Sequence, residues 1–455
     1  MRPRETVSEI RRMLRLFWPI ICGQLAFNSM SVVDTVMAGA AGPLELSGVA
    51  IGASLFFPLL FTMVGLSSAI QPITAFLTGA GRQDEIPDRL HQITVVCLIL
   101  SLALSALVAL IPQVYRFIPA DGAMIAVATG YLYALAPAVP LMILFNVLRG
   151  YCEGLGITAP TLWFGFIQLF LNIPLNYVFI FGRLGVPAFG GIGCGIASAL
   201  TAALSAVLFV AYIEISPRFA RVRLYRRWYP LSRAYIRRFL KLGVPLALSA
   251  TMEMACFATA ALILSPFGPA VVSAHTITLN ISGMLFMLPL SVAVVSTIRT
   301  GMAMGAGDWH RCALTVRAGF IISGFFYICS TLLLLFGRHF LAGLYSDDEE
   351  IIALTASLLL LNCLYLLPDH IQMECIGILR GFKDSRTIFC VTLVSYWVIG
   401  MPLGVSLAWG LCGEPLKAYG IWIGFTGALT AAMAIYAARL AVLFKTRRLP
   451  RALRL

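Results

Sequence analysis

The chain has 455 residues, of which 60% are hydrophobic and only 12% are charged. Because a soluble domain carries roughly 25% charged residues, this excess of apolar surface needs lipid as its solvent, and a soluble globular fold is excluded. The formal net charge of +13 suits a nucleic-acid partner, but the basic residues follow a membrane topology instead.

Twelve long apolar segments follow one another along the chain, six in each half. Each has about 20 residues or more, enough to cross a hydrocarbon core of about 30 Å. They predict an all-α polytopic membrane protein with twelve transmembrane helices. The second segment of each half is long enough to tilt or bend in the bilayer. The expected spans are 14–38, 47–78, 91–115, 124–148, 160–182, 193–215, 238–264, 271–298, 316–337, 351–379, 387–410 and 419–443.

The charged N-terminus runs directly into the first span, without the short apolar stretch and small-residue cleavage site of a signal peptide. If the N-terminus is cytoplasmic, all but four of the 33 Lys and Arg fall on the cytoplasmic side. This is the positive-inside bias of a membrane protein with both termini in the cytoplasm, and no nucleic-acid partner is expected. The four exceptions are Arg116, Arg183, Arg338 and Lys417.

Landmarks of the first half recur in the second half at a nearly constant offset. Pro19 is matched by Pro245, and the Gly-Ala-Gly at 79–81 is matched by the one at 305–307, with the same separation in both cases. A Leu-Arg-Gly-aromatic signature at 148–151 returns at 379–382, at an offset only slightly larger. We infer that the chain is a duplicated unit, each copy of which occupies about half of the sequence.

The duplication predicts two lobes. Each half has an even number of spans, so the copies share one orientation and are related by a pseudo-two-fold axis along the membrane normal. We expect an N-terminal six-helix lobe over 1–217 and a C-terminal six-helix lobe with a basic cytoplasmic tail over 238–455. Between them, the basic cytoplasmic linker 218–237 is expected to contain an interfacial helix. Two such lobes that rock about a central cleft favour transport by alternating access.

Four acidic residues lie deep in apolar context, where a charge costs roughly 2.5–3.5 kcal/mol at the bilayer centre. They are Asp34, Glu253, Asp369 and Glu374. The first three have no acidic counterpart in the other repeat, so the shared scaffold does not require them, and this favours a functional role. Glu374 is near the cytoplasmic end of its span, where we expect it to meet solvent or Arg380.

The second half groups several of these side chains. Tyr365 lies one helical turn before Asp369 and Gln372 nearly one turn after it, so all three can share a face. Glu253 occupies the middle of the seventh span, where small neighbours allow close helix approach. When deprotonated, two carboxylates and a phenol offer hard oxygen ligands to a small cation such as Na⁺. When protonated, they form a proton carrier. Either arrangement gives cation coupling.

The first half offers a separate polar set. Asp34 stands in the first span near Gln24 and Asn28, where it could contact a cationic substrate, bind a proton or join two helices. Asn172 and Asn176 are four residues apart on the fifth span. They either line the cavity of the first lobe or make hydrogen bonds between helices.

The motifs in this order resemble the multidrug and toxic compound extrusion (MATE) transporters, specifically the NorM-like branch. The similarity includes segments 33–39, 172–177 and 190–195 in the first half, and 274–280 and 379–384 in the second. It implies an antiporter in a bacterial inner membrane that exports lipophilic, mostly cationic drugs in exchange for Na⁺ or H⁺. The implied protein is a monomer surrounded by membrane lipid, with no enzymatic activity and no cofactor other than the coupling ion.

The resemblance also assigns roles. It implies a cation site, with bound Na⁺ if coupling uses sodium, at Glu253, Tyr365 and Asp369, and a substrate or proton site at Asp34, Asn172 and Asn176. The sequence departs from the expected pattern at His370-Ile371, where smaller apolar residues are expected. A flippase-like exporter of a lipid-linked or other amphiphilic metabolite is the alternative, although it should carry more basic residues in its cavity. Secondary candidates are Gln24, Asn28, His275, Asn280, Gln372 and His370.

Overall fold

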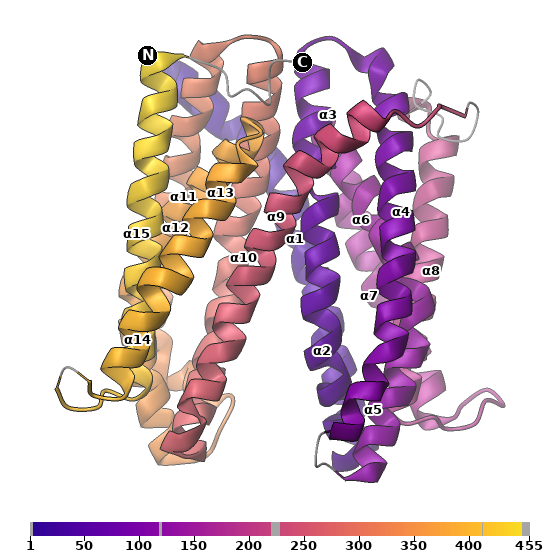
Figure 1. The fold of residues 1–455 in the computed structure, drawn as a ribbon, viewed down its shortest axis with the longest axis vertical. Helices are drawn as coiled ribbons and strands as arrows, with labels where there is room; N and C mark the ends of the chain where they lie inside the picture. The colour runs from indigo at the N-terminus through magenta and orange to yellow at the C-terminus, as the bar shows by residue number, and fades with distance from the viewer. Residues whose placement is uncertain (1–2, 118–120, 220–227, 412, 448–455) are drawn as a thin grey trace. The chain divides into compact units, whose positions relative to one another are not determined.

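The structure, a computed structural model, describes residues 3–117, 121–219, 228–411 and 413–447. Within these ranges all regular structure is helical, and twelve segments are long and apolar enough to cross a membrane. The predicted all-α, twelve-span fold is confirmed. The helices labelled in Figure 1 are α1 (Pro3–Ala41), α2 (Pro43–Ser67), α3 (Ile70–Gly79), α4 (Ile86–Leu110), α5 (Gly122–Leu135), α6 (Val139–Gly154), α7 (Ala159–Phe181), α8 (Gly191–Ile215), α9 (Arg233–Leu264), α10 (Pro269–Gly305), α11 (Trp309–Gly343), α12 (Glu349–Gly381), α13 (Ser385–Thr392), α14 (Met401–Ala408) and α15 (Ala418–Thr446).

Three spans are interrupted. The second span breaks between α2 and α3 at residues 68–69, whereas its repeat counterpart α10 is continuous. The fourth passes through a 3₁₀ turn at Ala136–Ala138. The eleventh contains a π-helical segment, Leu393–Gly400, between α13 and α14. Pro402 follows this segment and has no N–H to continue the α-helical ladder, so the wider turns upstream accommodate the break.

The chain forms two compact units whose boundaries differ from the expected lobes. Unit 1 consists of Met1–Phe17 and Leu248–Leu455, and unit 2 is Trp18–Ala247. The first turns of α1 therefore belong with the second half of the sequence, and the first turns of α9 belong with the first half. Each division falls close to a proline inside the helix, Pro19 in α1 and Pro245 in α9.

Equivalent contacts hold the two exchanged segments. In unit 1 the Thr315 hydroxyl donates to Glu9 Oε1 at 3.1 Å. In unit 2 the Arg89 guanidinium lies 4.4 Å from the centre of the Tyr235 ring. By the offset that relates Pro19 to Pro245, Tyr235 is the repeat counterpart of Glu9, and Thr315 is the counterpart of Arg89. The duplication therefore preserves the place of the contact while its chemistry changes.

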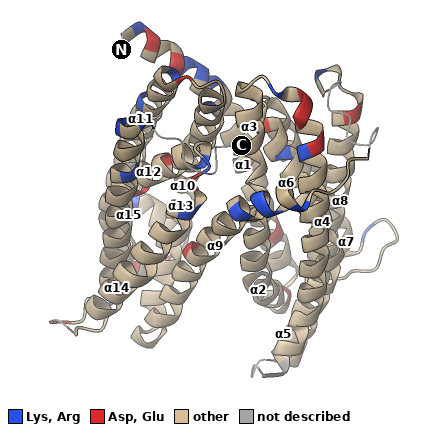
Figure 2. Ribbon diagram, turned by 45° about the horizontal axis from the view of Figure 1, so that its top comes forward, with Lys and Arg blue, Asp and Glu red and all other residues tan. Residues whose placement is uncertain are grey.

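The segment expected to form an interfacial helix is arranged differently. Residues 228–232 are non-helical, and α9 runs without interruption from Arg233 into the seventh span. The rest of the predicted basic linker, 220–227, and the tail 448–455 lie outside the described residues. In each unit the Lys and Arg residues gather mainly at one end of the helices, the end at which α1 and α9 begin (Figure 2).

Candidate functional site

In unit 2, the register of two helices brings Asp34 to the asparagines of α7. α1 and α7 pack closely at Gly23 and Gly165, where a Cβ on Gly165 would lie 2.5 Å from the Gly23 carbonyl oxygen. Asp34 and Asn176 each lie eleven residues beyond their glycine. Because these spans run in the same direction, the two polar side chains meet three turns further along.

Asp34 accepts hydrogen bonds from amide and hydroxyl side chains of α7 and α8. Asn172 Nδ2 and Asn176 Nδ2 donate to Oδ1 at 3.0 and 2.6 Å. The Ser198 hydroxyl of α8 donates to Oδ2 at 2.9 Å. The second proton of the Asn176 amide goes to Asn172 Oδ1 at 2.9 Å. Donors to both oxygens stabilise an ionised carboxylate within a half-buried setting.

The predicted set of the first half is therefore brought together, with two additions, Ser198 and Cys194. Ser198 was missed, although it follows the quoted segment 190–195 by less than one turn. Cys194, inside that segment, also contributes a side-chain hydrogen bond to Asp34. The secondary candidates Gln24 and Asn28 lie further back on α1, more than one turn from Asp34, and are half-buried and exposed respectively.

In unit 1, Glu253 of α9 is reached from the π-helical segment. The Tyr396 hydroxyl donates to Glu253 Oε1 at 3.1 Å and accepts from Gln372 Nε2 of α12 at 3.2 Å. The neighbouring Trp397 donates its indole N–H to the Met252 carbonyl of α9 at 3.0 Å. Two consecutive aromatic residues of the π-helical segment, Tyr396 and Trp397, therefore form hydrogen bonds to α9. Sequence reasoning missed Tyr396, because regular helical spacing does not reveal a π-helical turn.

Asp369 is buried on α12, with 2% of its surface exposed, and interacts electrostatically with Glu253. Tyr365 interacts with both acids. Its ring packs edge-on against Trp422 of α15, at 5.5 Å between centroids. The three residues of the predicted cation set therefore lie in one region of unit 1, where Tyr365 belongs to the apolar core, Asp369 is buried and Glu253 is half-buried. Arg380, near the end of α12, also attracts Glu253 electrostatically.

The other candidates of the second half lie in different surroundings. His275 is fully buried, 6.0 Å from the Trp422 ring, and neither of its ring nitrogens has a described hydrogen-bond partner. His370 is buried beside Tyr327 of α11, and its Nδ1 lies 2.9 Å from the Leu366 carbonyl oxygen. Asn280 is exposed. Gln372, also a secondary candidate, joins the acid network through its hydrogen bond to Tyr396.

Glu374 contradicts the expectation that it meets solvent or Arg380. Its side chain is fully buried, and its Oε1 accepts from the Ser296 hydroxyl at 2.6 Å. A span end is not necessarily open to water, because α10 and α11 cover this face of α12. Nearby on α10, Arg299 forms a two-point ion pair with Glu9 at 2.7 Å.

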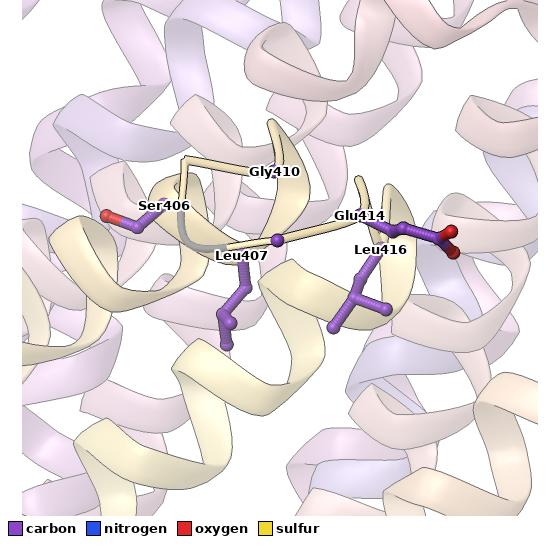
Figure 3. Close-up of a pocket in the computed structure, with 6 residues that line it drawn as sticks. Ser406, Leu407, Gly410, Glu414 and Leu416 are labelled. Atoms are coloured by element: carbon purple, nitrogen blue, oxygen red, sulfur yellow. The ribbon is translucent and has the colours of Figure 1, made fainter.

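A surface pocket of about 240 Å³ lies in unit 1. It is formed by the end of α14 and the turn that leads to α15 (Figure 3). The side chains of Leu407 and Leu416 point the same way there, whereas Glu414 points aside. None of the predicted site residues lines it. Among the described residues, no group of three or more His, Cys, Asp or Glu could hold a metal ion.

A duplicated twelve-span chain with acidic residues inside the spans of each unit has the features of a membrane transporter. The MatE family model matches this chain twice, over residues 19–178 and 245–406. The chain belongs to the MatE family. The two matches begin at Pro19 and Pro245, so they also bear out the duplication inferred from the sequence.

Curated relatives match almost the full chain. Multidrug resistance protein NorM of Aliivibrio fischeri is 38% identical over 436 residues, which cover 95% of this chain and 94% of the relative. NorM of Vibrio cholerae is 36% identical, with 95% of both chains covered. Multidrug resistance protein MdtK of Edwardsiella ictaluri is also 36% identical, with the same coverage.

Solved structures share the fold. The crystal structure of the eukaryotic MATE transporter AtDTX14 matches with a TM-score of 0.86 at 20% identity, with 96% of each chain covered. A multidrug resistance MATE family transporter in an outward-facing conformation matches with a TM-score of 0.85 at 20% identity, with 96% of this chain and 97% of that chain covered. At these identities the similarity concerns the fold alone.

Proposed function

We propose that the protein exports lipophilic organic cations in exchange for Na⁺ or H⁺. The observation that carries the proposal is the electrostatic interaction between Glu253 and Asp369, two acids in the membrane-spanning part of unit 1. The hydrogen bond described for Glu253 comes from a neutral phenol, and no described ion pair involves either acid. Arg380 attracts Glu253 electrostatically, but two carboxylates in this setting need further positive charge, and a mobile cation supplies it. Relatives named as multidrug resistance proteins support small organic substrates.

Glu253, Asp369 and Tyr365 form the coupling site in this proposal. Na⁺ would take oxygen ligands from the two carboxylates and the phenol, whereas H⁺ would neutralise one carboxylate. Tyr396 holds Glu253 when the ion is absent. Through Gln372, it also ties the carboxylate of α9 to α12. Loading and release of the ion would therefore change how these two helices are joined.

The cluster around Asp34 has the second role. Asn172, Asn176 and Ser198 hold the carboxylate in a fixed place, where its charge can attract an organic cation or bind a proton. In the proposed cycle the two lobes rock between outward-facing and inward-facing states. Ion binding favours drug release to the outside, and ion release permits drug capture from the inside.

The energetics favour more than one coupling cation per drug. A tenfold gradient is worth about 1.4 kcal/mol, and moving one charge across 100 mV is worth about 2.3 kcal/mol. One-for-one exchange against a monovalent drug moves no net charge and loses the voltage contribution. The protein is proposed to act as a monomer in a bacterial inner membrane, with both termini in the cytoplasm, consistent with its loop charges.

Transport by purified protein in liposomes tests the proposal. Na⁺ and pH gradients are imposed separately, and uptake of ethidium is compared for wild type, Glu253→Gln and Asp369→Asn. We expect one gradient to drive wild-type transport, an imposed potential to alter its rate, and both variants to lose coupling. Ethidium transport that follows neither gradient would refute cation coupling. Flipping of a lipid-linked sugar without any drug transport would support the flippase-like alternative.

A further inference from the structure

Glu374 lies outside the proposed coupling site and faces a different side of α12. It is five residues from Asp369, which is about 140° around the helix. Gln372 points toward the π-helical segment and Tyr396. Glu374 points instead toward α10 and α11, where it contacts Ser296 and Gly319. The site described above does not use this carboxyl.

The packing around Glu374 fits a carboxyl group closely. A Cβ added to Gly319 of α11 would lie 1.9 Å from Glu374 Oε1 and 3.0 Å from the Ser296 hydroxyl. Only glycine leaves this space open. Oε1 accepts from Ser296, whereas Oε2 is buried without a hydrogen-bond partner among the described residues. A carboxylate oxygen without a donor is unfavourable inside a protein, whereas a protonated one carries no charge to solvate.

The titratable and charged groups on the surrounding helices do not neutralise the carboxyl. On α10, Arg299 lies one turn beyond Ser296, but both ends of its guanidinium pair with Glu9. On α11, the residues one turn to either side of Gly319 are Thr315 and Ser323. On α12, the neighbours are the buried Cys375 and His370, whose Nδ1 bonds its own helix.

We propose that Glu374 is a second proton-binding site of unit 1, holding a proton on Oε2 while α10, α11 and α12 are packed as described. The proton would leave when these helices separate enough to admit water to the carboxyl. This inference deepens the proposed cation-coupled transport and depends on it for its role in the cycle. It predicts that H⁺ affects transport even if Na⁺ is the ion at Glu253 and Asp369.

Infrared difference spectroscopy of the full-length protein tests the protonation directly. The carbonyl-stretch band of a protonated, buried carboxyl is compared at neutral pH in wild type and Glu374→Gln. Glu153→Gln is the matched control, because Glu153 is equally enclosed but accepts from Gln71 at 2.8 Å and Thr161 at 3.0 Å, with Arg149 at 3.8 Å. We expect Glu374→Gln to lose a band that Glu153→Gln keeps. An unchanged band in Glu374→Gln overturns the proposal.

A second variant keeps the test valid if Glu374→Gln does not fold. Ser296→Ala removes the described donor to Oε1 and leaves the carboxyl in place. We expect the band to persist and to move to higher frequency, because the carbonyl loses a hydrogen bond. Absence of any frequency change would count against a protonated carboxyl at this position.

Proton counting separates this inference from the proposed function. In weakly buffered liposomes, Glu374→Gln should still transport ethidium but move about one proton fewer per cycle than wild type. If wild type transports no ethidium, the proposed function fails whatever the infrared result. If wild type transports ethidium and Glu374→Gln moves the same number of protons, only the role assigned to Glu374 fails.

Discussion

Removal of one hydroxyl, Tyr396→Phe, should tighten cation binding at the coupling site. This hydroxyl donates to Glu253 at 3.1 Å, and a hydrogen bond to a charged group contributes about 1.5–3 kcal/mol. Without it, the ion-free carboxylate is less stable, whereas a carboxylate neutralised by Na⁺ or H⁺ loses less. Because about 1.4 kcal/mol is a factor of ten, the cation concentration for half-saturation should fall about tenfold to a hundredfold.

Intrinsic tryptophan fluorescence can follow this titration, since Trp422 packs against Tyr365 of the coupling set. Tyr151→Phe is the control. Tyr151 is also buried, but its hydroxyl has no described hydrogen-bond partner and it belongs to the other unit. We expect the control to titrate like wild type. Weaker cation binding by Tyr396→Phe would refute the reasoning, because it would mean that the phenol oxygen itself holds the ion.

Three further changes address packing and charge. Asp34→Asn should lower the unfolding free energy by about 1–3 kcal/mol, because an amide then faces its donors, and should abolish ethidium transport; undiminished transport would argue against a role at this site. Gly319→Ala should lower the unfolding free energy by about 1–3 kcal/mol, because the added methyl group overpacks the space beside Glu374. The double variant Gly319→Ala/Glu374→Ala should recover much of the lost thermal stability in detergent. If Glu374→Ala did not raise the melting temperature of Gly319→Ala, the close contact between Gly319 and the Glu374 carboxyl would be contradicted. Glu9→Gln removes the buried carboxylate that pairs with Arg299, whose side chain is 15% exposed, and should lower the unfolding free energy by about 3 kcal/mol. Glu5→Gln, at a side chain that is 42% exposed, should leave the melting temperature almost unchanged.

The sequence was sufficient to predict the fold and many of the residues in the polar network. Apolar length predicted the twelve spans, because a bilayer requires long uninterrupted segments. The repeat offset predicted the duplication that the family model then matched twice. The resemblance to MATE transporters grouped Asp34 with Asn172 and Asn176, and hydrogen bonds join these side chains, although their role stays a prediction. Charge in apolar context was the informative signal for the acidic residues.

What the sequence did not reveal depends on packing between helices. Tyr396 reaches Glu253 from a π-helical segment, whose phase differs from that of an α-helix. Ser198 looks like an ordinary small residue of a membrane helix until α8 is placed beside α1. Glu374 was expected near water because its position along the span is close to the cytoplasmic end. The sequence did not show that its face of the helix is covered by α10 and α11. The roles of the coupling residues depend on ion binding, which hydropathy does not report.

The exchange of helix beginnings at Pro19 and Pro245 has a consequence for biosynthesis. Segment 3–17 packs with residues such as Arg299 and Thr315. These contacts can therefore form only after much of the second half has been synthesised. An ancestor with only one copy of the repeat could form the same contacts in a dimer, if the first helical turns of each subunit packed against the other subunit. Gene fusion would then have turned a domain-swapped pair of subunits into one chain.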